Sequence, residues 1–404
     1  MKTAIFGYGT VGSGVAAILE QNRDIIARSA GEEISLKYVL DIREFPGDPI
    51  QEKIVHDIGT ILADPEVETV VETMGGVEPA FTFVRKALEA GKNAATSNKE
   101  LVAKHGAQLL KTAAEHNVNF FFEASVGGGI PILRPMHDCL TADRILEICG
   151  ILNGTTNYML TRMKRDGASY DDVLHQAQAN GYAERNPSAD VGGFDACRKI
   201  AILTSLACGR QVDYEDIFTE GITELSVTDF AYAKAMNGDI KLLGSSSISG
   251  GEVFAKVAPE IISEDDPLYS VNDVFNAIKI RGDMLGNVMF YGKGAGSLPT
   301  ASAVISDVVQ TVRNRGRNLP VAWDTQKQEI ADSRRFVSSF LVRVKGDPAD
   351  SLTAVTELLG PVKTVQPENV EGEYGVVTEQ MSAGELEDRC SRLKGFISRL
   401  YIRD

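Results

Sequence analysis

The sequence lacks the patterns typical of disulfide-bonded, nucleic-acid-binding and membrane proteins. Its five cysteines form no CxxC pair and no metal-ligand spacing, which favours reduced thiols in a cytoplasmic protein over a disulfide-bonded secreted one. The 41 basic residues are outnumbered by 56 acidic ones, and a net charge of −15 argues against a nucleic-acid partner, which would need a basic surface. No apolar run is long enough to cross a bilayer and no signal-peptide pattern is apparent, so we expect no membrane partner.

The remaining composition is that of an ordinary globular protein, with 43% hydrophobic and 24% charged residues. A chain of 404 residues is too long for one core, so two or three domains are expected. The one basic cluster, Arg313 to Arg317, precedes Leu319-Pro320 and is predicted to be a solvated linker.

Over about the first 140 residues, short apolar strands alternate with helices through short loops. This alternation predicts an α/β fold with a parallel, doubly wound sheet. The expected strands are 2–6, 34–42, 67–73, 93–97 and 118–124, and the expected helices are 10–28, 50–62, 79–90 and 99–116.

Beyond about residue 140 the alternation is less strict, which predicts a second, α+β domain. Its expected elements are a strand at 144–152, a helix-rich stretch at 156–236, and strands at 239–248, 252–262, 274–281 and 287–291. A helix at 301–314 is then expected to return to the first domain. A polar stretch separates a tail of about 335–404, whose strand-helix-strand-strand-helix-strand order is that of a ferredoxin-like unit.

A glycine pattern follows the first predicted strand directly and opens a helix, which is the context that a dinucleotide-binding fingerprint requires. Its first glycine allows a tight turn, and its second lets the backbone approach a pyrophosphate at the helix N-terminus. Outside this context the glycines would indicate only a turn. The expected cofactor contacts in this turn are Gly7, Tyr8, Gly9, Thr10, Val11 and Gly12.

The residues after the second strand leave the choice of cofactor open. Asp41 follows Gly12 by more than the roughly 20 residues usual for the acid that binds the 2′-hydroxyl of NAD. Arg43 could instead pair with the 2′-phosphate of NADP, and both side chains could simply face solvent. NAD and NADP therefore both remain, with NADP preferred, and Arg43 is counted with Thr73 among the expected cofactor contacts.

Three further segments lie at strand ends or helix starts. Lys99 follows a strand at the carboxyl edge where doubly wound sheets bind ligands, although an ordinary surface lysine is an equal alternative. The segment from Glu123 to Pro131 contains three glycines and could line a cation or cofactor site with carbonyl groups, or form only a tight turn. In the segment Asn153 to Tyr158, Thr155 or Thr156 is expected to cap a helix whose amides could bind a carboxylate.

The segment from Tyr182 to Lys199 contains several ionisable side chains that could take part in a reaction. Asp195 and Lys199 lie four residues apart at the head of an apolar helical stripe. A surface pair of this kind would only stabilise the helix, by about 0.3–0.5 kcal/mol. A lysine removed from water at a core edge would instead be able to give or take a proton.

Taken in order, these segments resemble the homoserine dehydrogenase family over nearly the whole chain. The glycine turn is generic, whereas the others are specific in this succession. The matching segments are Gly7 to Gly14, Thr96 to Ala103, Phe122 to Pro131, Gly150 to Tyr158, Gly181 to Lys199 and Gly294 to Ala303.

The resemblance implies the interconversion of L-homoserine and L-aspartate 4-semialdehyde with NAD(P)(H), a step toward threonine, methionine and isoleucine. It implies that Lys99 and Lys199 are catalytic with Asp195, and that Na⁺ or another monovalent cation binds mostly through backbone carbonyls. The implied substrate contacts are Glu184, Tyr182, Gly154, Thr155 and Asp190, and the implied cation positions are Glu123, Val126, Gly128 and Ile130.

The resemblance also implies a division into three domains. Residues 1–140, with a return helix near 299–315, would form the Rossmann-type NAD(P)-binding domain, and 141–298 the catalytic, substrate and oligomerisation domain. Residues 335–404 resemble an ACT regulatory domain, but the usual Asp-x-Pro-Gly turn is replaced by Asp347-Pro-Ala349. A homodimer or homotetramer is expected.

Two other functions explain part of these features. A non-catalytic NAD(P)-sensing regulator would use the glycine turn and the tail but not the charged residues between Tyr182 and Lys199. Another amino- or hydroxy-acid dehydrogenase on the same fold would use both the glycine turn and the charged residues.

Overall fold

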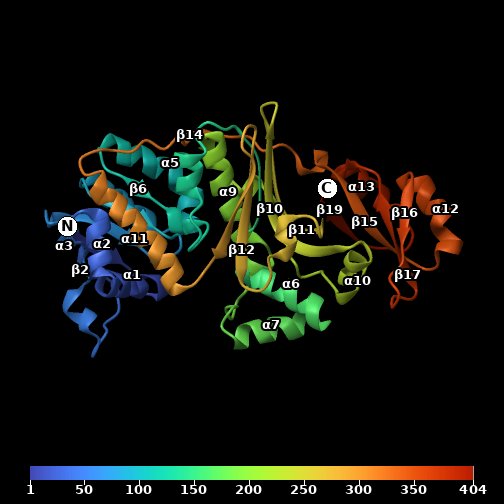
Figure 1. Ribbon diagram of the computed structural model, residues 1–404, viewed down its shortest axis with the longest axis horizontal. Coiled ribbons are helices and arrows are strands. Elements are labelled where there is room, and N and C mark those ends of the chain that lie inside the picture. The colour runs from blue at the N-terminus through green and yellow to red at the C-terminus, as the bar shows by residue number, and fades with distance from the viewer. Residues whose placement is uncertain (404) are drawn as a thin grey trace. The chain divides into compact units, whose positions relative to one another are not determined.

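The computed structural model describes residues 1–403 and divides into two units (Figure 1). The first unit comprises Met1–Ile145, Ala201–Tyr214 and Gly282–Gln328. The second comprises Leu146–Ile200, Glu215–Arg281 and the chain from Glu329 onward. Each unit is built on one large sheet, and the first unit also contains a separate two-stranded sheet.

The sheet of the first unit confirms the predicted doubly wound fold. Its six strands pair in parallel in the order β3-β2-β1-β4-β5-β6, which is the strand order of a Rossmann-type dinucleotide-binding domain. The strands are β1 (Lys2–Phe6), β2 (Ser35–Leu40), β3 (Ile54–Val55), β4 (Val67–Glu72), β5 (Asn93–Thr96) and β6 (Phe120–Phe121).

Helices cover this sheet, and the last of them comes from late in the chain. In α11, Ala301 and Val304 join the same apolar core as Val15 of α1. The contact is close, since a Cβ on Gly14 would lie 2.6 Å from Ser297 Oγ. The helices are α1 (Thr10–Gln21), α2 (Arg23–Ala30), α3 (Ile58–Ala63), α4 (Ala80–Glu89), α5 (Lys99–Glu115) and α11 (Ser297–Arg313).

Three predictions for the first unit are wrong. The segment 50–62, expected to be one helix, consists of a 3-10 turn (Pro49–Lys53), strand β3 and helix α3. A new helix begins at α3 because Asp57 caps it, accepting from the Gly59 amide at 3.0 Å. The strand expected at 118–124 has only two residues, because the chain turns into a 3-10 helix at Glu123. The basic cluster is not a free linker, since Arg315 makes ion pairs with Glu68 and Glu32.

The second unit contains a larger sheet in the order β12-β7-β10-β11-β19-β15-β17-β16. A long antiparallel hairpin, β10 with β11, forms its centre, and β11 then pairs in parallel with β19 through Glu260↔Tyr401 and Ile261↔Ile402. The strands are β7 (Ile145–Ile151), β10 (Gly238–Ser249), β11 (Glu252–Ser263), β12 (Phe275–Gly282), β15 (Val337–Lys345), β16 (Val362–Val365), β17 (Glu373–Thr378) and β19 (Phe396–Ile402).

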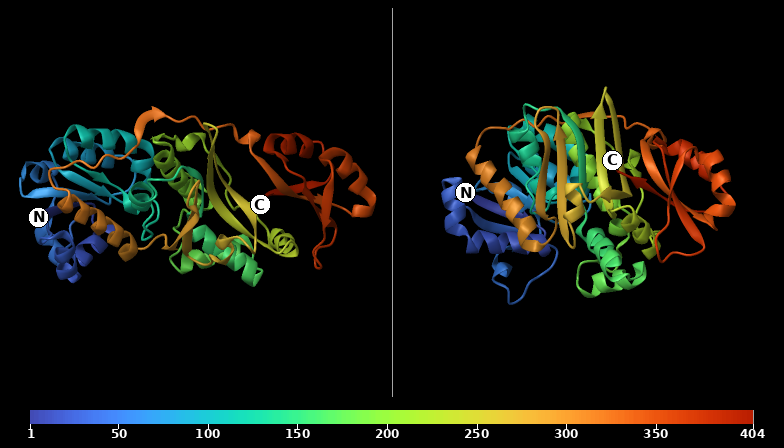
Figure 2. Two further views of the ribbon diagram at one scale, coloured as in Figure 1. Left: turned by 45° about the horizontal axis from the view of Figure 1, so that its top comes forward. Right: turned by 45° about the vertical axis from the view of Figure 1, so that its right-hand side comes forward.

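The tail has the predicted element order, β15-α12-β16-β17-α13-β19, with one short strand, β18, added before α13. Figure 2 shows the tail in red, with its helices beside its strands. Its helices pack on one face of its strands through a core that includes Phe340, Val342, Tyr374 and Leu386. The other helices of this unit are α6 (Gly154–Asp166), α7 (Tyr170–Ala179), α8 (Ser188–Val191), α9 (Phe194–Cys208, continuing into the first unit) and α10 (Val227–Ala235), and the tail adds α12 (Pro348–Leu359) and α13 (Ala383–Cys390).

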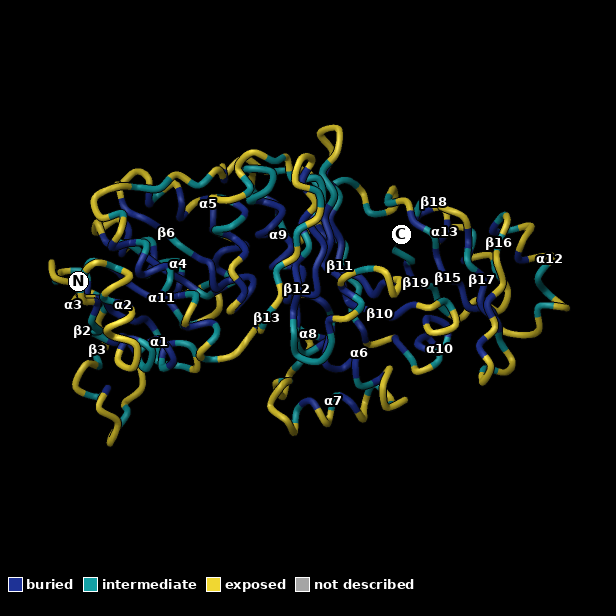
Figure 3. The backbone as a smooth tube through the Cα atoms, viewed as in Figure 1, coloured by how far each residue is buried: buried dark blue, intermediate teal, exposed yellow. Residues whose placement is uncertain are grey.

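Five further strands complete the chain, namely β8 (Arg210–Gln211), β9 (Phe218–Thr219), β13 (Gly286–Lys293), β14 (Asp324–Lys327) and β18 (Met381–Ser382). Figure 3 shows that the β10–β11 hairpin is buried over most of its length, whereas the loop after α7 is largely exposed. Across residues 1–403, no helix is long and apolar enough to cross a membrane.

Candidate active site

The turn after β1 has the geometry that the glycine pattern predicts. Gly7 has a φ of 92°, which favours glycine, and its carbonyl accepts a hydrogen bond from Thr73 Oγ1 at 2.7 Å. A Cβ on Gly12 would lie 2.1 Å from the Gly7 oxygen, so α1 can pack this closely only with glycine. A Cβ on Gly9, by contrast, would meet no atom of residues 1–403 within 4 Å. The backbone at Gly9 is therefore open to a ligand at the start of α1.

Asp41 and Arg43 lie beside this turn. Asp41 Oδ2 accepts from the Tyr8 amide at 2.7 Å, and the Arg43 guanidinium donates to both Asp41 oxygens at 2.9 and 3.0 Å. Through these bonds Arg43 holds the pKa of the Asp41 carboxyl well below its usual range. The carboxylate is thus engaged within the protein, while the Arg43 side chain stays 55% exposed.

Lys99 is the first residue of α5. The start of this helix is fixed by Asn98 and by the buried carboxyl of Glu72. Asn98 caps the helix by accepting from the Leu101 amide at 3.1 Å. Glu72, fully buried at the end of β4, accepts from Thr96 Oγ1 at 2.5 Å and from Asn98 Nδ2 at 3.5 Å, and its burial raises the pKa of its carboxyl. Sequence reasoning missed Glu72, although a glutamate closing an otherwise apolar strand was a visible signal.

The side chain of Glu123 is held by backbone amides of the segment that follows it. Its buried carboxylate accepts from three successive backbone amides, those of Ile132, Leu133 and Arg134, at 2.6, 2.9 and 2.7 Å. The side chain therefore caps the start of the following helical turns, which begin later than the predicted position of Pro131.

Behind this loop lies a buried carboxyl that sequence reasoning also missed. Asp307 of α11 accepts from the Glu123 amide at 2.9 Å and pairs with Arg134 at 2.8 Å. Burial, reinforced by the Glu123 charge, raises the pKa of Asp307 to about 7. Its position on an apolar helical face gave no reason to connect it with residue 123.

The backbone of the glycine segment is tightly packed. Gly128 has a φ of 56°, and a Cβ there would lie 2.3 Å from the Gly294 oxygen. The Gly127 carbonyl accepts from the Ile130 amide at 2.9 Å. Of the residues that the structure describes, none donates a backbone hydrogen bond to the carbonyl oxygens of Val126 or Gly128.

In the second unit, Asp195 and Lys199 form a buried pair on α9. Their exposed fractions are 3% and 8%, so this is not a surface pair. Lys199 Nζ donates to Asp195 Oδ2 at 2.8 Å and to the Leu152 carbonyl at 2.8 Å. A lysine held in this way is removed from bulk water with its Nζ oriented by two acceptors.

Asn153 connects this pair to α6, and the predicted cap at Thr155 or Thr156 is wrong. Asn153 Oδ1 accepts from the Thr156 amide at 2.8 Å, so Asn153 is the cap. Its Nδ2 donates to Asp190 Oδ1 at 2.7 Å and to Asp195 Oδ2 at 2.9 Å. One amide therefore lies between two carboxylates that would otherwise repel each other, a role that the cap position alone did not reveal.

The other predicted substrate residues lie on α6 and on the loop before α8. Thr155 Oγ1 donates to the Tyr182 carbonyl at 2.6 Å, and the Tyr182 ring lies 4.9 Å from that of Tyr158. A Cβ on Gly154 would lie 2.8 Å from the Val274 oxygen. Glu184 is exposed. The structure thus brings Asn153, Asp190, Asp195 and Lys199 together, whereas Glu184 lies on the exposed loop.

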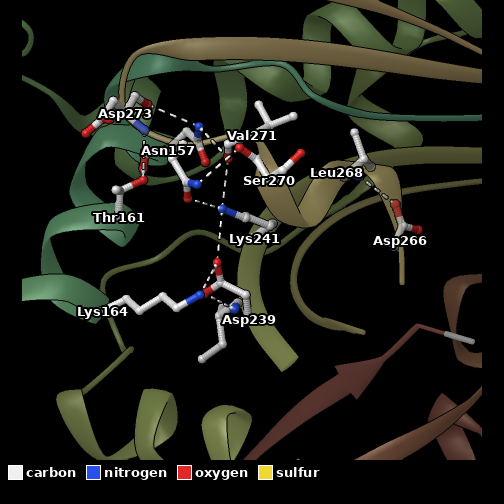
Figure 4. A network of polar contacts seen from close by, with 12 residues as sticks. Asn157, Thr161, Lys164, Asp239, Lys241, Asp266, Leu268, Ser270, Val271 and Asp273 are labelled. Carbon is white, nitrogen blue, oxygen red and sulfur yellow. Dashed lines mark hydrogen bonds and ion pairs between the residues drawn. The ribbon is translucent and has the colours of Figure 1, made fainter. Parts of the chain in front are cut away.

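A second polar network joins α6 to β10 and to the segment after Leu268 (Figure 4). Asn157 Nδ2 donates to the Asp273 carbonyl at 3.1 Å. Lys241, 1% exposed, donates to the Val271 carbonyl at 2.9 Å and pairs with Asp239, which also pairs with Lys164 of α6 at 3.0 Å. Burial lowers the pKa of Lys241. This network fixes the loop against which Gly154 packs.

Together, an open glycine turn on a Rossmann-type sheet and a buried lysine held by an aspartate define an oxidoreductase that uses a dinucleotide. Comparison with known proteins gives the family. Residues 7–123 match the model of the homoserine dehydrogenase NAD binding domain, and residues 131–309 match the model of homoserine dehydrogenase. The chain belongs to the homoserine dehydrogenase family.

Individual relatives agree with this assignment. The chain is 44% identical over 319 residues to a homoserine dehydrogenase of Synechocystis sp., covering 77% of this chain and 73% of the relative. It superposes with a TM-score of 0.93 and 32% identity on a homoserine dehydrogenase from Thiobacillus denitrificans, covering 100% of this chain and 98% of that one. A hyperthermophilic archaeal homoserine dehydrogenase in complex with NADPH superposes with a TM-score of 0.64 and 26% identity, over 77% of this chain and 97% of that one. The chain is therefore an oxidoreductase of the CH–OH group with a nicotinamide cofactor.

Proposed function

We propose that the protein interconverts L-homoserine and L-aspartate 4-semialdehyde, with NADP(H) as the preferred cofactor. The observation that carries the proposal is the buried Lys199, held by Asp195 and by the Leu152 carbonyl at 2.8 Å each. Because general acid–base groups work when held in reach of the reacting hydroxyl, a fixed and desolvated ammonium suits this reaction.

The preference for NADP rests on the residues after β2. Both Asp41 oxygens already accept hydrogen bonds, from the Tyr8 amide and from Arg43, which leaves less capacity to bind a ribose hydroxyl. Arg43 remains half-exposed at the same place and suits a 2′-phosphate. The residues of this chain proposed to hold the cofactor are Gly7, Tyr8, Gly9, Thr10, Val11, Gly12, Arg43, Thr73 and Lys99.

The residues of the second unit would control the proton of the substrate hydroxyl. When bound, the nicotinamide accepts or supplies the hydride. Lys199 takes the hydroxyl proton in oxidation and returns it in reduction, and its ammonium stabilises negative charge on the oxygen. Asp195 orients Lys199, and Lys99 assists the proton transfer.

The remaining predicted contacts would bind the amino-acid part of the substrate. Glu184 would pair with its ammonium group, and its exposed position leaves it able to do so. The start of α6, at Gly154 and Thr155, presents amides to the carboxylate. Tyr182 would contact the substrate, and Asp190 would support the site through Asn153.

A monovalent cation such as Na⁺ would bind at the glycine segment. Carbonyl oxygens of Val126 and Gly128 that accept no backbone hydrogen bond within residues 1–403 are suitable ligands, with the carbonyls of Glu123 and Ile130 completing the set. The Glu123 carboxylate would act indirectly, since three amides already occupy it.

The proposed domains are those expected from the sequence: a cofactor domain over 1–140 with the return helix, a catalytic and oligomerisation domain over 141–298, and an ACT-like regulatory tail over 335–404. The tail's element order supports the ACT-like fold. The turn from Gly346 to Ala349 caps α12 through Asp347, which accepts from the Ala349 amide at 2.8 Å. We propose a homodimer or homotetramer.

A spectrophotometric assay at about 340 nm, the absorbance of the reduced nicotinamide, tests the proposal. Turnover with L-homoserine, but not with threonine or malate, is expected, and NADP⁺ should give a higher kcat/KM than NAD⁺. Absence of turnover with homoserine would favour a sensing regulator, and turnover with malate would favour another hydroxy-acid dehydrogenase.

A further inference from the structure

The tail contacts a segment that packs against the start of the helix carrying Lys199. Arg399 of β19 and Glu220, which follows β9, form an ion pair at 2.7 Å, and their side chains are only 18% and 33% exposed. The Arg399 guanidinium also lies 4.8 Å from the centre of the Tyr401 ring. Because β9 pairs with β11 and β11 pairs with β19, Glu220 is held between the sheet and the tail.

Glu220 follows β9 and in turn packs beside the turn at 190–193 that leads into α9. The next residues pack against it directly: the Ile222 amide donates to the Val191 carbonyl at 2.8 Å, and a Cβ on Gly221 would lie only 2.1 Å from the Val191 oxygen. A Cβ on Gly193 would meet Thr219 at 3.1 Å and the Glu220 oxygen at 3.4 Å.

The turn from Asp190 to Gly193 determines where α9 begins. Gly193 has a φ of 82°, its amide donates to the Asp190 carbonyl at 2.9 Å, and its carbonyl accepts from the Cys197 amide at 2.9 Å. Asp195 and Lys199 lie in the next two turns of the helix. A shift at this turn would therefore move Lys199 Nζ relative to the Leu152 carbonyl.

We propose that Glu220, held by Arg399 of the tail, is a positioning residue for Lys199. The tail then contributes to the reaction by bracing the turn at 190–193, independently of any ligand that the tail binds. The inference rests on the proposed function, because it assigns the proton transfer to Lys199. Small displacements of a reacting group reduce rates strongly, so loss of this brace should lower kcat.

The test uses charge reversal in the full-length protein. R399E should increase hydrogen exchange of the amides at 191–197 about 10-fold and lower kcat about 10-fold, with an unchanged KM for NADPH. The double variant E220R/R399E should recover kcat to within about 3-fold of the wild type, because the ion pair is restored with opposite polarity. E220Q, which keeps the shape of the side chain, should show a smaller loss of the same kind and serves if R399E does not fold.

R335E is the matched control. It reverses a charge that also joins the tail segment to β11, through an exposed ion pair of Arg335 with Glu252 at 2.9 Å, but this pair does not touch the turn at 190–193. We expect R335E to resemble the wild type in exchange and kcat. Equal behaviour of R399E and R335E, or a loss of kcat with unchanged exchange at 191–197, would overturn the proposal. Faster exchange in R399E without homoserine turnover by the wild type would keep the brace and refute the proposed function.

Discussion

Two buried lysine–carboxylate pairs, each four residues apart, differ in their surroundings. Lys199 and Asp195 on α9 are 2.8 Å apart, and the Leu152 carbonyl and Asn153 complete their hydrogen bonds. Lys256 and Glu260 on β11 are 3.3 Å apart, and among residues 1–403 Lys256 Nζ has no hydrogen-bond acceptor. Spacing and burial alone therefore do not identify a reactive lysine.

What surrounds Lys256 is aromatic rather than polar. Its Nζ lies 3.5 Å from the centre of the Tyr401 ring and 4.0 Å from that of Phe336. Burial lowers the pKa of Lys256, an effect only partly opposed by Glu260. Since both rings belong to the segment after Glu329, this pair lies where the tail joins the sheet, and we assign it to stability rather than to catalysis.

The largest difference between the pairs should appear when each lysine is removed. Lys199→Ala should lower kcat about 10³-fold, because the general acid–base group is lost, and leave the Kd for NADPH nearly unchanged. Steady-state kinetics and a fluorescence titration with NADPH measure the two effects. Turnover like that of the wild type would refute the role of Lys199.

Asn153→Ser should have the next largest effect. Serine still caps α6 but cannot donate an amide hydrogen to Asp190 and Asp195, so kcat should fall about 10- to 100-fold with little loss of stability. Ser169→Ala, which removes the cap of the neighbouring α7, should show the opposite pattern: about 1 kcal/mol less stability and unchanged kcat. The same kinetic loss in both variants would mean that capping, not the bridge between the aspartates, is what matters.

Lys256→Met should change kcat less than about 2-fold, because methionine fills a similar volume among the aromatic rings. Glu260 would keep Arg403 as a partner at 3.3 Å. Kinetics and thermal unfolding of the variant measure the outcome. A loss of kcat comparable to that of Lys199→Ala would abolish the distinction between the two pairs.

The smallest expected effect is the pH dependence of the free energy of unfolding that Lys256 contributes. Because the pKa of Lys256 is lowered on folding, the unfolded chain binds more protons between the folded pKa and about 10.5, and this group makes stability rise with pH in that window. Relative to Lys256→Met, the wild type should therefore become more stable as pH increases toward about 10. Unfolding in denaturant at several pH values checks this, and a difference that is constant with pH would contradict the lowered pKa.

Much of the fold followed from local patterns. The strand and helix succession of the first unit and the element order of the tail were predicted from periodicity and turn residues. The prediction of one helix at 50–62 was wrong because apolar periodicity does not show that a new helix begins after the cap at Asp57. The cap was misplaced because Asn153, Thr155 and Thr156 all suit that role, and only the hydrogen bond that Asn153 accepts from the Thr156 amide distinguishes them.

Contiguous residues were sufficient to predict the cofactor turn, since a strand, three glycines and a helix start are its sequence pattern. They were also sufficient to place Asp195 and Lys199 on one helical face. Only the tertiary structure decided that Asn153 bridges Asp190 and Asp195, that Asp307 lies beside Arg134, and that Lys256 faces aromatic rings. The reason is physical: desolvation and hydrogen-bond partners come from residues far apart in the sequence, and these determine what a buried charge can do.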